Sequence, residues 1–123
     1  MVSKDDTTVR QLQILLAAFA QARDWGQFHT PRNLALALVG EVGELSALLQ
    51  WLSDEEVEVW LNDERGREKL AAEMADVFAY LLRLADVANV DLAAALRNKT
   101  LLNEARYPQD RARGSSAKYT QYE

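Results

Sequence analysis

Apolar residues recur along this chain every three or four positions, the spacing of amphipathic α-helices, and no run alternates as a half-buried strand would. Only two prolines and five glycines interrupt the pattern. It predicts four long helices and one short helix, over residues 8–23, 30–51, 53–62, 67–88 and 91–107. We therefore expect an all-α fold that resembles a four-helix bundle.

Polar residues and one proline mark the expected starts of three helices. Asp6 and Thr7 offer caps for the first helix. Thr30 is the expected N-cap of the second, and a proline follows it at the first helical position, where its missing N–H is not needed. Ser53 and Glu56 have the spacing of a capping box, which predicts the start of the short helix.

Breaks later in the chain set the expected domain limits. Residues 62–66 are typical of a polar turn, Asp91 caps the last long helix, and Pro108 prevents its continuation. The remainder is polar and contains Gly-Ser-Ser, which is typical of an extended or mobile tail. We predict one all-α domain over residues 1–108 and a polar tail over residues 109–123.

The second helix carries acidic residues on its apolar side. With Leu34 set at zero and about 100° per residue, four later leucines (Leu38, Leu45, Leu48 and Leu49) fall within about 60° on either side, and Glu41 falls among them at about 340°. Glu44 falls near 280°, at the edge of the stripe. An ordinary amphipathic helix would place neither carboxylate there.

The fourth helix repeats this arrangement. With Glu73 at zero, three apolar residues lie between about 20° and 60°, Tyr80 lies near 340°, and Asp76 lies near 300°. The segments Glu41-x-x-Glu44 and Glu73-x-x-Asp76 thus share one design, a carboxylate within the apolar stripe and a second one beside it. Clustered carboxylates are unfavourable unless cations compensate them, and oxygen-only ligands favour Mg²⁺ or Mn²⁺.

Acidic pairs of this spacing also occur in two settings without magnesium. A single E-x-x-E motif usually marks a solvated helix face or half of an ion-pair ladder, although two pairs within apolar stripes argue against this. Di-iron carboxylate bundles use Glu-x-x-His on two helices, and neither pair here is followed by histidine. Because Mg²⁺ is usually completed by substrate phosphates, the pattern indicates a phosphate-bearing ligand.

Composition narrows the chemistry further. The net charge of −5 and the pI of about 4.9 argue against a nucleic-acid binder. The absence of cysteine excludes thiolate chemistry, and the single histidine makes a histidine-rich metal site hard to build. No apolar stretch reaches the ~20 residues of a membrane span, and the first ten residues are polar rather than signal-like. We expect a cytoplasmic protein without a membrane partner.

Basic and aromatic residues supply candidate ligand contacts. Lys99, Asn103 and Arg106 share one face of the last long helix, where the lysine and arginine suit a phosphate tail. Their position near a helix C-terminus is also what the helix dipole favours. Trp25, His29 and Trp51 flank the second helix and suit a nucleobase, although each alone is more often a core or interface residue.

Several segments together resemble the MazG-like all-α nucleoside triphosphate pyrophosphatases, and more closely their single-domain dCTP pyrophosphatase branch. The segments are RDWGQFHTPRNLALALVGEVGELSALLQW, EMADVFAYLL, VDLAAAL, KxxxNxxRYP and SSAKYT. The resemblance covers nearly the whole chain. It implies Mg²⁺-dependent hydrolysis of the α–β phosphoanhydride of a (d)NTP, with Mn²⁺ as a substitute, to give a monophosphate and pyrophosphate.

The resemblance also implies roles for individual residues. Glu41 and Glu44 would be catalytic, and Glu44 is our candidate for orienting or deprotonating the attacking water. Tyr80 would contact substrate near the metals. The implied Mg²⁺ ligands are Glu41, Glu44, Glu73 and Asp76; the nucleoside contacts are Trp25, His29 and Trp51; the phosphate or sugar contacts are Lys99, Asn103, Arg106 and Tyr107.

We expect dCTP or a modified dCTP to be the substrate, removed from the nucleotide pool by a homo-oligomer, a tetramer in preference to a dimer. The same chemistry on dUTP or another dNTP is the nearest alternative. A non-catalytic helical module that binds nucleotide and metal is a second alternative. A di-iron oxidase is a third, and it predicts visible absorbance.

Overall fold

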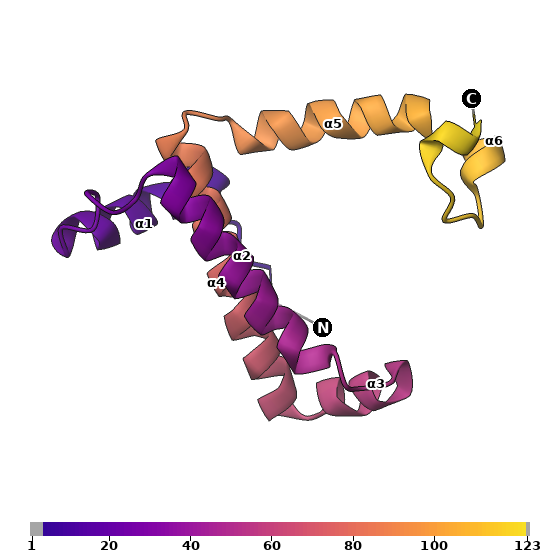
Figure 1. The fold of residues 1–123 in the computed structure, drawn as a ribbon, viewed down its shortest axis with the longest axis horizontal. Helices are drawn as coiled ribbons and strands as arrows, with labels where there is room; N and C mark the ends of the chain where they lie inside the picture. Colours follow the sequence, from indigo (N-terminus) through magenta and orange to yellow (C-terminus); the bar gives the residue numbers. More distant parts are fainter. Residues whose placement is uncertain (1–3, 123) are drawn as a thin grey trace. The chain divides into compact units, whose positions relative to one another are not determined.

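The computed structural model describes residues 4–122, and these are helical with connecting loops and no β-strand (Figure 1). The all-α prediction is therefore confirmed. The elements are α1 (Val9–Ala22), α2 (Pro31–Leu49), α3 (Asp54–Asn62), α4 (Glu64–Val87), α5 (Leu92–Arg106), α6 (Gln109–Ala112) and a 3₁₀ helix, η1 (Tyr119–Tyr122).

The chain divides into two compact units, one ending at Asn89 and one beginning at Val90. In the first unit α4 is the central helix, since α1, α2 and α3 all pack against it. Figure 1 shows α2 lying alongside α4. Leu34 and Leu82, on these two helices, are each only 1% exposed and form the centre of the small apolar core.

Polar caps fix the helix starts, mostly as predicted. The Thr30 side chain accepts a hydrogen bond from the Asn33 N–H, and Pro31 is the first residue of α2. Ser53 forms the predicted capping box at α3. The cap of α1 is instead Thr8, because Gln11 lies three residues after it and completes a reciprocal pair of hydrogen bonds; the prediction of Asp6 or Thr7 was wrong.

The corner between α3 and α4 is tighter than the sequence suggested. Asp63 is at once the C-cap of α3 and the N-cap of α4, and its carboxylate accepts from the Arg65 N–H. The predicted polar turn over residues 62–66 was therefore wrong, since α4 already begins at Glu64. Gly66 allows this packing: a Cβ there would lie 2.1 Å from the carbonyl oxygen of Trp60.

The second unit consists of α5 followed by the tail. Asp91 caps α5 as predicted, and Pro108 comes directly after its end. The tail is not simply extended, because α6 and η1 form within it. Aromatic contacts explain the order: Tyr107 packs edge-on against Tyr119 and Tyr122, with ring centroids 6.2 and 5.9 Å apart.

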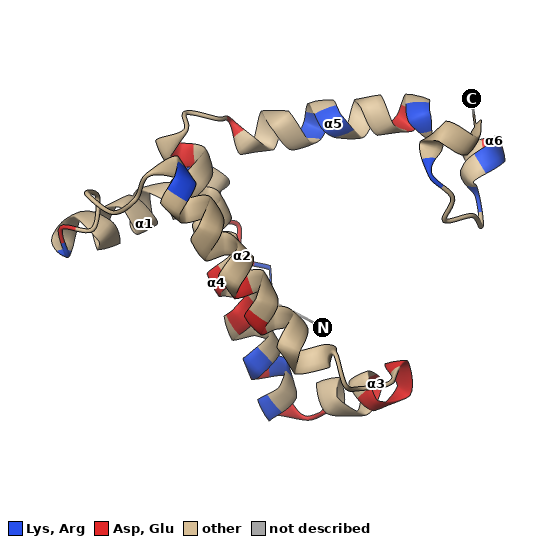
Figure 2. Ribbon diagram, in the orientation of Figure 1, with Lys and Arg blue, Asp and Glu red and all other residues tan. Residues whose placement is uncertain are grey.

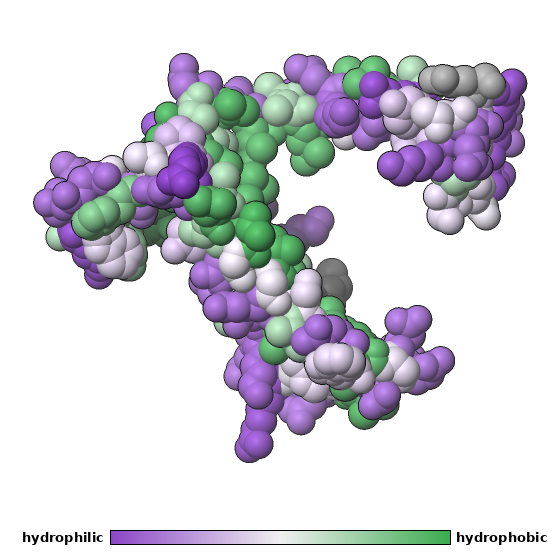
Figure 3. Space-filling model, in the orientation of Figure 1, coloured by the Kyte–Doolittle hydropathy of each residue, from purple (hydrophilic) through white to green (hydrophobic). Residues whose placement is uncertain are grey.

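Apolar side chains remain exposed on the first unit. On α2, Leu36, Val39 and Val42 are 59, 68 and 43% exposed, and Figure 3 shows a run of hydrophobic surface along this helix. In the part of the chain that the structure describes, no helix by itself is long and apolar enough to cross a membrane; α2 and α3 qualify only when taken together across a 95° bend.

Candidate active site

Three carboxylates from two helices meet where α2 packs on α4. Glu41 comes from α2, and Glu73 and Asp76 come from α4; one oxygen of each lies within 4.8 Å of the others. Figure 2 shows acidic residues gathered on adjoining stretches of the two helices. The wheel positions account for this meeting, because both glutamates lie in the apolar stripes by which α2 and α4 pack together.

The two glutamates are half-buried, and each has one buried oxygen without a partner. Among the described residues, Glu41 Oε2 and Glu73 Oε2 are shielded from solvent and accept no hydrogen bond. Burial, and after it the neighbouring Glu44 carboxylate, raises the pKa of each glutamate above its usual range. Asp76 adds to the shift of both. An unpartnered buried carboxylate oxygen is unfavourable unless a cation or proton reaches it.

The donor set fits a hard divalent cation. Every candidate ligand atom is a carboxylate oxygen, the ligand type that Mg²⁺ and Mn²⁺ prefer. Glu44 is exposed on α2 and close enough to the cluster to influence the pKa of Glu41 and Glu73. The cluster of Glu41, Glu73 and Asp76, with Glu44 beside it, is hereafter called the carboxylate cluster.

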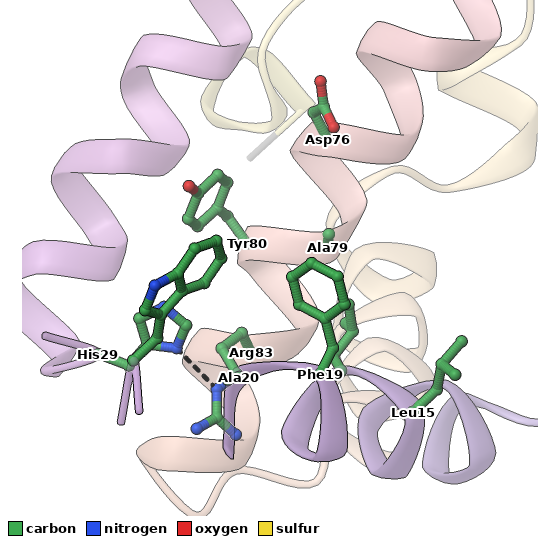
Figure 4. A pocket seen from close by; sticks show the side chains of 10 residues that line it. Leu15, Phe19, Ala20, His29, Asp76, Ala79, Tyr80 and Arg83 are labelled. Carbon is green, nitrogen blue, oxygen red and sulfur yellow. Dashed lines mark hydrogen bonds between the residues drawn. The ribbon is translucent and has the colours of Figure 1, made fainter. Parts of the chain in front are cut away.

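A cavity of about 420 Å³ lies between α1, α4 and the loop that precedes α2. In Figure 4, Asp76 lies at one end, His29 and Arg83 lie at the other, and Tyr80 stands between them. Asp76 thus belongs both to the carboxylate cluster and to the cavity wall. The ten lining residues are Leu15, Leu16, Phe19, Ala20, Trp25, His29, Asp76, Ala79, Tyr80 and Arg83.

The structure brings together most of the predicted base contacts. Trp25 and His29 have ring centroids 6.3 Å apart, and both line the cavity with Tyr80. The same three residues also line a neighbouring cavity of about 350 Å³ against the start of α2. These residues are close because the loop of residues 23–30 folds back over the middle of α4.

Trp51 is not part of this group. It is 85% exposed and lines neither of the two cavities. Trp25 and His29 precede α2 and Trp51 follows it, so a helix of 19 residues, about 28 Å long, separates them. A single chain therefore does not form the predicted three-membered aromatic box.

The predicted phosphate contacts lie in the second unit. Lys99 is exposed on α5, and Asn103 and Arg106 are half-buried. The Arg106 guanidinium stacks over the Tyr119 ring, 4.4 Å from its centroid, and the Tyr107 ring packs on the same tyrosine. Arg106 and Tyr107 thus contact the tail within this unit. The role of these residues, and of Lys99 and Asn103, toward phosphate stays a prediction.

Arg83 is a polar residue of the cavity that the sequence pattern did not single out. Its Nε donates a hydrogen bond of 3.0 Å to His29 Nδ1, drawn as a dashed line in Figure 4. A signal was present, because Asp76, Tyr80 and Arg83 follow an i, i+4, i+7 pattern that places them on one face of α4. Leu15 and Phe19 of α1 are also four residues apart and so share an apolar face, but this spacing did not assign them to a cavity.

Comparison with known proteins identifies this combination of fold and site. No protein-family model matches the chain. A solved structure of a pyrophosphatase from Archaeoglobus fulgidus is similar, with a TM-score of 0.74 and 39% identity over 88% of this chain and 99% of that one. The fold and the carboxylate cluster thus define a pyrophosphatase of the all-helical type.

Sequence relatives sharpen that class. The chain is 49% identical over 117 residues to dCTP pyrophosphatase 1 of Rattus norvegicus and 48% identical over 116 residues to that of Homo sapiens. Each alignment covers 94% of this chain and 68% of the relative. The chain belongs to the dCTP pyrophosphatase family. Membership implies a requirement for a divalent metal, in agreement with the carboxylate cluster.

Proposed function

We propose that the protein hydrolyses dCTP, or a modified dCTP, to the monophosphate and pyrophosphate with Mg²⁺, and so removes it from the nucleotide pool. The names of the sequence relatives support dCTP as the substrate. The observation that carries the proposal is the position of Asp76, which belongs both to the carboxylate cluster and to the wall of the cavity. A nucleotide in the cavity would therefore extend toward a cation site.

The carboxylate cluster would hold the metal through Glu41, Glu44, Glu73 and Asp76. The unpartnered Oε2 atoms of Glu41 and Glu73 support this assignment, since a cation would satisfy both. Bound Mg²⁺ would neutralise charge on the triphosphate and lower the pKa of the attacking water. Mn²⁺, which prefers similar oxygen ligands, is expected to substitute.

In the proposed reaction the water oxygen forms a bond to the α-phosphorus while the bond from that phosphorus to the bridging oxygen of pyrophosphate breaks. Glu44 is the proposed acceptor of the water proton, because it is exposed and lies beside the three carboxylates whose oxygens meet. Glu41 would assist by holding the cluster in place. Lys99 and Arg106 are proposed to bind the pyrophosphate, and Asn103 and Tyr107 to contact the phosphates or the sugar.

The nucleoside would occupy the aromatic end of the cavity. Trp25, 43% exposed, offers a flat apolar surface for stacking, and Tyr80 stands between this end and Asp76. Stacking alone tolerates any base, so preference for cytosine requires hydrogen bonds to the base edge. Among the aromatic residues that line the cavity, His29 is our candidate for such a bond.

We further propose that the protein is a homo-oligomer, a tetramer in preference to a dimer. The exposed apolar residues of α1, α2 and α4 support association. Trp51 could reach a base only if a second chain presents it, which would also favour an oligomer. A mass of 13.9 kDa in solution, that of one chain, would contradict this part. The cytoplasmic location stays a prediction.

A panel assay tests the proposed function. Purified protein with Mg²⁺ would be given the eight common (d)NTPs, dUTP and 5-methyl-dCTP, and pyrophosphate and monophosphate would be measured separately. We expect equal amounts of both products, most rapidly from dCTP or 5-methyl-dCTP, and their loss in Glu41→Ala. If dUTP is hydrolysed fastest, the preferred substrate is dUTP, as in the nearest alternative. If no nucleotide gives product with either Mg²⁺ or Mn²⁺, a non-catalytic binding module would be favoured.

A further inference from the structure

His29 accepts a hydrogen bond from a group that cannot itself accept one. The donor is Arg83 Nε, 3.0 Å from His29 Nδ1. A guanidinium is always protonated and has donors only, so Nδ1 must carry a lone pair. A neutral imidazole has one N–H, and here it must lie on Nε2. Within residues 4–122, Nε2 has no hydrogen-bond partner of its own.

Arg83 is itself held in place. Its guanidinium faces Asp86 Oδ2 at 3.5 Å, and the other oxygen of Asp86 pairs with Arg10 of α1 at 2.9 Å. The side chains of Arg83 and Asp86 are only 16 and 22% exposed. Gln13, which is buried, receives a 3.4 Å hydrogen bond from Arg10 and donates to the Leu82 carbonyl oxygen. This chain of contacts ties α1 to α4 behind the imidazole.

The surroundings of His29 also favour its neutral form. Burial, and after it the Arg83 charge, lowers the pKa of His29 below its ordinary value of 6.5. From α4 the charged or titratable groups facing this region are Arg83, Asp86, Tyr80 and Asp76. On α1 the charged group is Arg10, which forms an ion pair with Asp86. The residues of α2 that line the second cavity include no charged group within the described part of the chain.

We propose that Arg83 is a positioning residue that fixes His29 as the neutral imidazole protonated at Nε2, so that His29 offers an N–H donor at the base end of the cavity. This inference rests on the proposed function only for the identity of the ligand. Cytosine carries two acceptors, O2 and N3, on the edge that a donor of this kind could contact. The arginine thereby decides whether His29 offers the base a donor or an acceptor.

The arrangement has a consequence for selectivity. An imidazole free to exchange tautomers could offer either a donor or an acceptor and would tolerate more kinds of base edge. Arg83 removes the choice, because the tautomer with the proton on Nδ1 would set an N–H against a guanidinium N–H. The same bond fixes the ring orientation, so the Nε2–H direction is preorganised before substrate enters.

The test is direct because His29 is the only histidine in the chain. Nitrogen-15 NMR of the labelled protein without nucleotide, recorded from pH 5 to 9, would report a single imidazole. We expect an unprotonated Nδ1 and a protonated Nε2 at neutral pH, with a pKa below 6.5. In Arg83→Met, which keeps the side-chain bulk and loses the donor, the pKa should move toward 6.5 and both tautomers should appear. Arg83→Lys is the conservative variant and should restore part of the bias.

Kinetics give a second readout. Arg83→Met should raise KM for dCTP about three- to tenfold with kcat within about twofold, the effect of losing one oriented hydrogen bond. The variant should also lower the ratio of kcat/KM for dCTP to kcat/KM for dUTP, or invert that ratio. Arg65→Met, an exposed arginine at the start of the same helix, is the matched control and should change neither spectrum nor KM.

Different results separate this inference from the proposed function. A wild-type spectrum with the proton on Nδ1, or an Arg83→Met spectrum identical to wild type, would overturn the role of Arg83 whether or not the protein hydrolyses dCTP. If Arg83→Met fails to fold, the wild-type and Arg83→Lys spectra decide the question. The expected spectra together with no turnover of any nucleotide would retain the role of Arg83 and overturn the proposed function.

Discussion

The two ends of the cavity differ in how their polar groups are satisfied. At the His29 end, the imidazole, Arg83 and Asp86 form a continuous chain of hydrogen bonds and ion pairs. Beside the other end, which Asp76 lines, Glu41 and Glu73 of the carboxylate cluster each keep a buried oxygen without a partner. In the first region the charges of Arg83 and Asp86 are paired within the protein, whereas the second lacks a positive charge. The difference supports the proposal that the His29 end recognises the base and that a bound cation completes the phosphate end.

The difference also has a thermodynamic side. A satisfied polar network adds rigidity at little cost in stability, whereas clustered carboxylates oppose folding until they are neutralised. Substitutions that remove a charge from the carboxylate cluster should therefore raise the stability of the metal-free protein and lower its activity.

The largest effect is expected from removing one charge of the carboxylate cluster. Glu73→Gln keeps the shape of the side chain but weakens its affinity for a cation, and we expect kcat to fall about a hundredfold or more. Steady-state kinetics at saturating dCTP and Mg²⁺ would measure the loss. Circular dichroism would confirm that the variant is folded. Turnover within about twofold of wild type would remove Glu73 from the metal site.

The aromatic end should respond through KM instead. Trp25→Ala removes a stacking surface worth about 1–3 kcal/mol per base, so KM for dCTP should rise about 5- to 150-fold with kcat little changed. Trp51→Ala is the informative comparison, because Trp51 lies away from both cavities in one chain. A KM effect as large as that of Trp25→Ala would mean that a second chain presents Trp51 to the base. No effect of Trp25→Ala on KM would separate the cavity from base binding.

Metal binding should stabilise the protein. At a free Mg²⁺ concentration a hundredfold above Kd, the free energy of unfolding should rise by about 2.7 kcal/mol. A thermal melt with and without Mg²⁺ would show this as an increase in Tm of several degrees. The same titration with Glu41→Gln should give a smaller shift or none. An equal shift in wild type and variant would place the stabilising cation elsewhere.

The smallest expected effect is a pH dependence of stability in the metal-free protein. Folding raises the pKa of Glu41 and Glu73 above the ordinary value of 4.5, so the folded state binds these protons more tightly. Their contribution to stability is therefore fully present below pH 4.5 and is lost as the pH rises through the raised pKa values. Urea unfolding of wild type and Glu73→Gln in chelator should show the variant gaining stability relative to wild type from pH 4 to pH 7. A constant difference would contradict the raised pKa of Glu73.

Most of the fold and about half of the site could be predicted from the sequence. The i, i+3 and i+4 spacing of apolar residues predicted the helices, and local signals such as Thr30-Pro31 predicted three of the starts. The convergence of Glu41 with Glu73 could also be anticipated, because a carboxylate within an apolar stripe must face the helix that covers the stripe. These features depend on the periodicity of single helices.

The missed features depend on contacts between distant segments. The bond from Arg83 to His29 spans 54 residues, and no helical periodicity links a loop residue to a helix. The separation of Trp51 from Trp25 follows from the length of α2, which the prediction contained but which the grouping of aromatics ignored. α4 starts early because Asp63 caps both α3 and α4. A cap signal considered for one helix at a time does not reveal that one residue serves two helices.

The shared cap at Asp63 bears on how this protein can be engineered. Because no spacer separates α3 from α4 and Gly66 lies against the Trp60 carbonyl, the corner between the two helices is tightly packed. A peptide tag or a new chain terminus inserted there would separate both helices from their common cap. The segment 113–118 lies between α6 and η1 outside any helix, and Gly114 within it has open space around it. Affinity tags and fluorescent labels should be accepted in this segment and rejected at the corner.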